Sequence, residues 1–379
     1  MIVGRVASSV VRRHVKYVDP VPTTEASGLV AETYAQIADE MRLVVTPALP
    51  HSIVPELLAA YWMLSREPLL PTTVVDRSVK EAVAATVSVA NICPYCVDMH
   101  SVGLYDLAGE PDAEAVVADR VEELADDQLR LAARWARSAH TADPPPFPFD
   151  EPARPELVGV VVGFHYISRM VNVFLANFLL PPGLNPRARR RLKRGISRVL
   201  HPTLHDPREP GRSVPLLPHA PLPASAGWAA GNPHVAAATG RAYAAFEAAG
   251  ERALSPVVRN LIEERLAGWH GEDTGLSRRW CELLVDGLPE ADRAAGRLAL
   301  LTAFASHQVD EEVIGEFRRH RPDDRSLVEA VAWASFAVAQ EVGARHVAAG
   351  RPGPEHGRRR GTDGPTRSLG RHSCRVTCG

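Results

Sequence analysis

The 379-residue sequence predicts an all-α protein, on three observations. Apolar residues recur at three- and four-residue spacings in several long segments, which is the period of a helix with one buried face. No segment shows the apolar–polar alternation that is typical of a half-buried strand. The chain is rich in alanine and valine, and aromatic residues make up only 6%. This composition favours helices that pack closely through small side chains.

The chain divides into four parts by composition. Residues 1–180 form a long helical region, and residues 181–233, rich in Pro, Gly and Arg, are predicted to be an extended connector. Residues 234–350 form a second helical region that is rich in alanine. Residues 351–379 are Gly-, Arg- and Pro-rich and cannot bury a core, so we expect a disordered tail. The length is consistent with two helical domains.

The helical period is clearest in four segments. Residues 78–90 and 116–139 carry it in the first region, and Pro144-Pro145-Pro146 ends the second of these helices and begins a loop. Residues 293–305 and 326–347 carry it in the second region. We therefore predict a helix over each of these ranges.

Charge and hydropathy indicate whether the protein binds nucleic acid or a membrane. The net charge is -2, so no overall field attracts nucleic acid or an anionic membrane. The basic run 186–198 contains no aromatic residue that could stack on a base, and we interpret it as a solvated helix face or linker charge. The most apolar window, 157–180, is interrupted by polar residues such as His165 and Arg169 and is interpreted as a buried helix. No export signal is recognisable, so we expect a cytoplasmic protein without nucleic-acid or membrane partners.

The chemistry is predicted at a cysteine pair. The chain has five cysteines, too few for a secreted disulfide scaffold: Cys93, Cys96, Cys281, Cys374 and Cys378. In a reducing compartment a Cys-x-x-Cys pair is more often catalytic, redox-sensing or metal-binding than structural. We expect Cys281 to be a small buried apolar residue, and we assign no role to the two cysteines of the tail.

The residues around the pair predict its local geometry. Pro94 suits the first position of a helix, which makes Cys93 the N-cap and places Cys96 in the first turn. Gly109 should end this helix. The positive end of the helix dipole stabilises a thiolate, so we expect lowered cysteine pKa values. Cys96 and His100 are four residues apart and therefore share one face of the helix.

Such a site suits peroxide chemistry. A thiolate that attacks a peroxide becomes a sulfenic acid, and a neighbouring thiol condenses with it to a disulfide. A histidine or glutamate can supply the proton that the leaving oxygen requires. An external dithiol then reduces the disulfide by exchange.

The pattern Glu81, eleven residues, Cys93, two residues, Cys96, three residues, His100 resembles the AhpD-like alkylhydroperoxidases of the carboxymuconolactone decarboxylase superfamily. The stretch 164–174 also resembles a helix of bacterial members. The resemblance covers residues 30–180 and implies an all-α fold, homo-oligomers and thiol-dependent hydroperoxide reduction. It implies Cys96 as the peroxidatic cysteine, Cys93 as its partner and Glu81 with His100 as the proton relay. Tyr95 stands where typical members carry a histidine. The implied reductant is an external dithiol protein, with no tightly bound cofactor.

Alternative interpretations remain open at this stage. Cys93, Cys96, His100 and a carboxylate could bind zinc, although no second Cys/His pair at a recognisable spacing is present. The lactone decarboxylases of the same superfamily are a rival enzyme class, but their chemistry needs no cysteine pair. A redox sensor or interaction scaffold would use the same fold without turnover. His165 is interpreted as a satisfied core histidine.

The second region aligns with the first without a gap. When Asp76-Arg77 is set against Asp292-Arg293, Thr86 meets Thr302 and the apolar positions largely agree. The catalytic positions do not agree, since Glu81, Cys93, Cys96 and His100 meet Arg297, Val309, Glu312 and Glu316. We therefore predict a degenerate second repeat that is kept for packing and not for chemistry.

Overall fold

The computed structural model describes residues 14–176, 178–181 and 183–347 of the chain. Within these residues the fold is all-α, as predicted: no β-strand is present, and the extended backbone makes one isolated bridge between Val15 and Leu175. The predicted disordered tail, with Cys374 and Cys378, lies outside the described residues. The α-helices are α2 (Gly28–Met41), α3 (Pro55–Leu69), α4 (Arg77–Ala90), α5 (Pro94–Leu107), α6 (Glu110–Val117), α7 (Asp127–Ser138), α8 (Arg154–Phe174), α9 (Pro186–His205), α10 (Pro233–Ala253), α11 (Pro256–Ala267), α12 (Arg279–Val285), α13 (Glu290–Ala305), α14 (Glu311–His320) and α15 (Asp324–Ala344).

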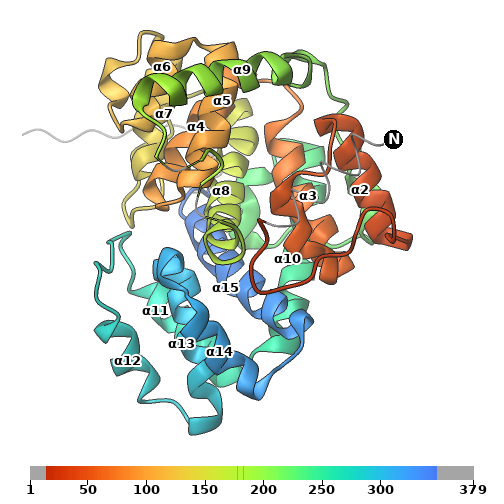
Figure 1. Ribbon diagram of the computed structural model, residues 1–379, viewed down its shortest axis with the longest axis vertical. Coiled ribbons are helices and arrows are strands. Elements are labelled where there is room, and N and C mark those ends of the chain that lie inside the picture. Colours follow the sequence, from red (N-terminus) through yellow and green to blue (C-terminus); the bar gives the residue numbers. More distant parts are fainter. Residues whose placement is uncertain (1–13, 177, 182, 348–379) are drawn as a thin grey trace, which may run out of the picture. The chain divides into compact units, whose positions relative to one another are not determined.

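Two long helices, α8 and α15, pack against each other at the centre of the molecule (Figure 1). Both are long and apolar enough to cross a membrane by length and composition. Their most apolar windows are, however, 100% and 83% buried inside the protein, as in the core helices of a soluble protein. The expectation of a buried helix in the window 157–180 is confirmed as far as Phe174.

Other helices pack on each central helix. Helices α3 and α4 pack on α8, and helices α10 and α13 pack on α15. Helix α3 also packs on α10 across the molecule. Each half contains a hairpin of two helices, α4–α5 in the first half and α13–α14 in the second. The described residues form one compact unit, so the boundaries at residues 180 and 233 stay predictions.

One predicted helix is interrupted. The range 116–139 contains the end of α6, a 3₁₀ turn at Val121–Glu123 and α7. Asp119 adopts a left-handed conformation, φ 55°, which aspartate tolerates better than most residues. The side chain of Asp126 then accepts hydrogen bonds from the backbone amides of Gln128 and Leu129 and starts a new helix. The apolar period continues across this break, which is why the sequence alone predicted one helix.

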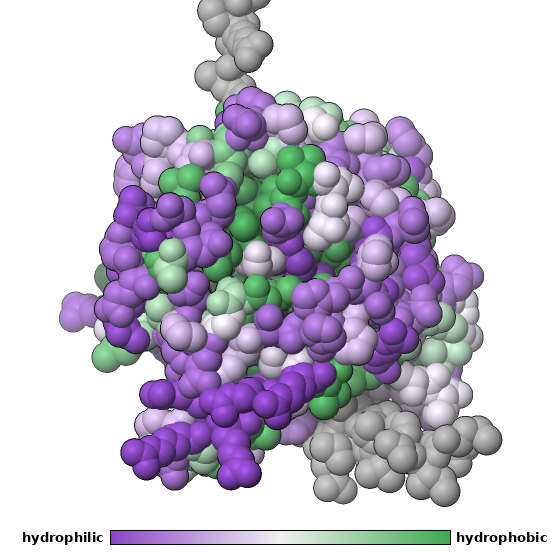
Figure 2. All heavy atoms as spheres, turned by 90° about the horizontal axis from the view of Figure 1, so that it is seen from above, coloured by the Kyte–Doolittle hydropathy of each residue, from purple (hydrophilic) through white to green (hydrophobic). Residues whose placement is uncertain are grey.

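The predicted connector is also not wholly extended, because it contains the 20-residue helix α9. Some of its basic residues are paired with acids of the first half: Arg189 donates to both carboxylate oxygens of Asp98, at 2.7 and 2.5 Å, and Lys193 donates to Glu114 at 3.1 Å. Lys193 is only 1% exposed. These ion pairs hold α9 over α5. Hydrophilic residues dominate this end of the molecule, with apolar residues in small patches between them (Figure 2).

Candidate functional site

The α4–α5 hairpin positions the cysteine pair. Helix α4 ends at Ala90, and Ile92 takes a left-handed conformation, φ 50°, that turns the chain. The amide of Cys93 donates to the carbonyl of Ser88 at 3.0 Å. Cys93 is the N-cap of α5 and Pro94 its first residue, as predicted. The helix ends at Leu107, two residues before Gly109, whose φ of 92° suits glycine.

Both thiols are free and buried, with Cys93 1% and Cys96 4% exposed. Burial raises the pKa of Cys96 well above its ordinary value, and the neighbouring Cys93 raises it further by hydrogen bonding and charge. The expectation that the helix dipole would lower this pKa is therefore wrong for Cys96. Loss of water around the sulfur disfavours the thiolate more than the helix N-terminus favours it. The resting site thus holds Cys96 as a neutral thiol.

Two hydroxyl groups act in the opposite direction. The nearby hydroxyls of Ser168, on α8, and Ser88, on α4, lower the pKa of Cys96. The Ser88 hydroxyl donates to the carbonyl of Ala84 at 2.7 Å, whereas the Ser168 hydroxyl is buried and has no hydrogen-bond partner within the described residues. It is therefore free to donate to the sulfur when negative charge develops there.

Glu81 and His100 form a direct contact, as the sequence predicted. His100 Nδ1 lies 2.6 Å from Glu81 Oε2, and Arg77 Nε donates to Glu81 Oε1 at 2.7 Å. Burial alone would raise the pKa of Glu81, but the charges and hydrogen bonds of Arg77 and His100 outweigh it and lower this pKa to about 2. An ionised carboxylate only accepts, so His100 Nδ1 carries the hydrogen. The other ring nitrogen, Nε2, then has a free lone pair and can accept a proton.

The second hairpin contains an ion pair at the same sequence spacing. Arg297 and Glu316 form an ion pair, and they are separated by 19 residues, as Glu81 and His100 are. The side-chain hydroxyls of Thr86 and Thr302 are both buried and without a hydrogen-bond partner among the described residues.

One curated relative covers almost the whole chain. It is an alkyl hydroperoxide reductase, Rv2159c of Mycobacterium tuberculosis (strain ATCC 25618 / H37Rv), which is 35% identical over 331 residues. The match spans 87% of this chain and 94% of the relative. The chain belongs to the AhpD-like alkylhydroperoxidase family. No family model matches it, and no solved structure matches it.

Three neighbours of the AhpD-like site were not identified from the sequence as site residues. Arg77 holds Glu81 ionised, and its i,i+4 spacing from Glu81 was the signal that could have found it. Phe164 of α8 packs edge-on against the His100 ring, with ring centroids 4.5 Å apart. Ser168, one turn further along α8, faces Cys96. The last two reach the site only through tertiary packing, so no local pattern could have found them.

Tyr95, which stands where typical family members carry a histidine, is buried. A hydrogen bond with Thr46 engages its side chain, and burial raises the pKa of Tyr95 to about 12. A phenol with this pKa stays protonated at neutral pH. Tyr95 can therefore donate a hydrogen bond near the thiols, but it cannot serve as a base there.

Two further predictions have clear outcomes. Cys281 is fully buried, as expected of a small apolar residue. His165 is buried too, but it is not a satisfied core histidine, because its Nε2 has no hydrogen-bond partner among the described residues. His165 lines a cavity, which explains why its Nε2 has no protein partner.

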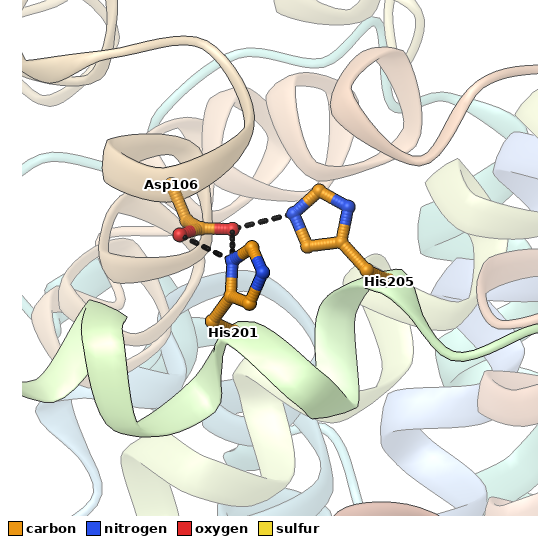
Figure 3. A group of neighbouring side chains, drawn as sticks. All are labelled: Asp106, His201 and His205. Atoms are coloured by element: carbon orange, nitrogen blue, oxygen red, sulfur yellow. Dashed lines mark hydrogen bonds and ion pairs between the residues drawn. The ribbon is translucent and has the colours of Figure 1, made fainter.

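A possible metal-binding group lies away from the thiols. Asp106 of α5 and the exposed His201 and His205 of α9 point toward one another (Figure 3). Their potential ligand atoms lie within 4.8 Å of one another, and within the described residues no other such set was found. Cys93, Cys96 and His100 are thus not gathered as the zinc alternative requires.

Proposed function

We propose that the protein is a thiol-dependent hydroperoxide reductase that uses Cys93 and Cys96 as its redox dithiol. The observation that carries this proposal is a row of hydrogen bonds that ends on the dithiol helix: Arg77 and His100 both contact Glu81, and His100 lies on the same helix as Cys96. A buried carboxylate fixes the histidine tautomer, and the histidine lies one helical turn from Cys96. The family relationship supports hydroperoxide reduction at the level of the family.

The reaction begins with a proton transfer. His100 Nε2 takes the proton of the Cys96 thiol, and the ionised Glu81 stabilises the imidazolium that forms. The hydroxyl of Ser168 donates to the developing thiolate. Because burial disfavours this thiolate, it forms only in small amounts at neutral pH, and substrate traps it.

Peroxide reduction then follows. The Cys96 thiolate attacks the terminal oxygen of the hydroperoxide, the O–O bond breaks, and Cys96 becomes a sulfenic acid. The alkoxide that leaves takes the proton from His100 and departs as an alcohol. The Cys93 thiol attacks the sulfenic sulfur, water is released, and a Cys93–Cys96 disulfide forms. An external dithiol returns two electrons by exchange and regenerates both thiols.

Thiol counting with disulfide mapping tests this proposal. One equivalent of tert-butyl hydroperoxide should remove two thiols from the native protein and produce a Cys93–Cys96 disulfide. Dithiol reductants of the lipoyl or thioredoxin type should restore the thiols and sustain turnover. A disulfide that forms once without catalytic turnover under either reductant would instead identify a redox sensor. Loss of thiols at other cysteines only would contradict the proposed dithiol.

A further inference from the structure

A cavity of about 320 Å³ lies beside the dithiol hairpin, where the ends of α4 and α13 approach α8. Its volume is at the lower end of the range for small-molecule sites, roughly 300–1,000 Å³. Neither cysteine lines it. The residues that matter for its chemistry are Thr86, His165, Arg169, Trp269 and Phe304.

Arg169 places a positive charge in the wall of this cavity. It is 6% exposed, and its guanidinium donates to the Ala303 carbonyl at 2.8 Å, the Asn91 side chain at 2.6 Å and the His165 carbonyl at 2.6 Å. All these acceptors are neutral, and no carboxylate of the described chain pairs with Arg169. Its Nη2 makes no hydrogen bond within the described residues. A buried cation without a counter-ion is costly, so a site of this kind favours an incoming anion.

His165 adds a donor to the same wall. Its Nδ1 lies 3.3 Å from Nη1 of Arg169. A guanidinium cannot accept, so Nδ1 must accept and the ring hydrogen must sit on Nε2. Burial, with the nearby Arg169 charge, lowers the pKa of His165 and keeps the ring neutral. The Nε2–H is thus a buried donor without an acceptor in the described structure.

The remaining wall is mixed. The hydroxyl of Thr86 and Nδ1 of His140 are further buried polar atoms without a hydrogen-bond partner in the described structure. Trp269 and Phe304 form an edge-to-face pair with ring centroids 6.0 Å apart. The acids that line the cavity have partners of their own, since Asp119 pairs with Arg137 at 2.7 Å. Two others are engaged as well: Glu272 pairs with Arg265 at 3.2 Å, and Asp273 accepts from the amide of Gly275 at 2.9 Å.

We propose that this cavity binds a small organic acid, with its carboxylate on Arg169, His165 and Thr86 and its apolar body against Trp269 and Phe304. A carboxylate only accepts hydrogen bonds and carries one negative charge, which matches the donors of Arg169, His165 and Thr86 and the Arg169 charge that no carboxylate pairs. The proposal does not depend on peroxide turnover, because no cysteine takes part in it.

Calorimetric titration of the full chain with benzoate tests the proposal. We expect saturable binding, at least tenfold tighter than that of neutral benzamide. Ala90→Phe places an aromatic side chain at the exposed mouth of the cavity and should abolish binding while the circular dichroism spectrum stays unchanged. Thr86→Val should weaken binding severalfold, and the matched Thr302→Val, which lies outside the cavity, should not. Equal binding of benzamide, no saturable binding, or inorganic phosphate binding as tightly as benzoate would overturn the carboxylate assignment.

The cluster of Asp106, His201 and His205 carries a second, independent inference. His201 Nδ1 lies 2.9 Å and His205 Nε2 lies 2.6 Å from the same carboxylate oxygen of Asp106. The two imidazole rings are 4.3 Å apart. Two imidazoles with a carboxylate, on an i,i+4 pair and a facing helix, form a set that suits a divalent transition metal.

We infer that this group binds Zn²⁺ or Co²⁺ and joins α9 to α5. Titration with Co²⁺ should give one bound ion and a visible spectrum without a thiolate charge-transfer band, because no cysteine is near. The double variant His201→Ala, His205→Ala should lose this spectrum, whereas the exposed His320→Ala should keep it. A spectrum that survives in the double variant, or one that carries thiolate bands, would overturn the assignment.

Discussion

Replacement of Glu81 by glutamine tests the proton relay and can be worked through in numbers. The folded protein lowers the pKa of this carboxyl from 4.5 to about 2, and Glu81 is 2% exposed. At 1.36 kcal/mol per pKa unit, the ionised form stabilises the fold by about 3 kcal/mol. Because the folded pKa is the lower one, this stabilisation is present above pH 4.5 and is lost as the pH falls toward 2. Glu81→Gln should remove it.

The variant should also lose activity. Without the carboxylate, nothing fixes the hydrogen on His100 Nδ1, and peroxide reduction should slow by roughly 10²–10⁴-fold, the usual effect of a positioned acid–base group. Urea unfolding at pH 7 and at pH 3, with tert-butyl hydroperoxide turnover, measures both effects. Glu316→Gln is the matched control, because Glu316 is the carboxylate of the Arg297–Glu316 ion pair in the second hairpin and its loss should leave turnover unchanged. Parent-like turnover and pH dependence in Glu81→Gln would refute the relay.

The remaining predictions concern the thiols and their neighbours. Cys93→Ser should accumulate sulfenic acid at Cys96, detectable by mass spectrometry, and Cys96→Ser should consume no peroxide. Because the pKa of Cys96 is raised well above its ordinary value, turnover should still be rising at pH 9. Turnover of Ser168→Ala should be slower than that of the parent protein at every pH. Tyr95→His restores the usual family residue and should leave turnover unchanged or raise it; abolished turnover would reveal a role for the tyrosine.

The features that follow from local chemistry could be predicted from the sequence. Pro94 and Gly109 bound the dithiol helix, and the family resemblance implied that Glu81 and His100 act together, which agrees with their contact in the structure. The pKa of Cys96 could not be predicted in this way. Helix position is visible in the sequence, whereas burial depends on α8, which brings Ser168 and Phe164 from far along the chain.

The sequence did not predict helix α9 within the connector, for a related reason. Its proline, glycine and arginine content is typical of a connector, and its helical form is stabilised by acids on other helices. Asp98 and Glu114 pair with Arg189 and Lys193, and neither acid can be recognised as a partner from the sequence. These pairs use part of the positive charge of the basic run within the chain.

The internal repeat gives the last prediction. We propose that the second half is a degenerate copy of the first, because the two hairpins, α4–α5 and α13–α14, have corresponding neighbours and corresponding contacts at the same register. Such a copy would take the place that a second subunit takes in a protein built from one repeat.

Truncation after Ala230 tests this role. It leaves every residue of the dithiol site but removes α10 from α3 and α15 from α8, so two apolar faces become exposed. Since apolar burial is the main stabilising term, about 25 cal/mol per Å², we expect the shortened chain to aggregate or to form a dimer through these faces. Truncation after Val347 is the control, because it removes none of the contacts described. A soluble, active monomer after the first truncation would show that the second half does not cover the first, and light scattering with peroxide turnover distinguishes these outcomes.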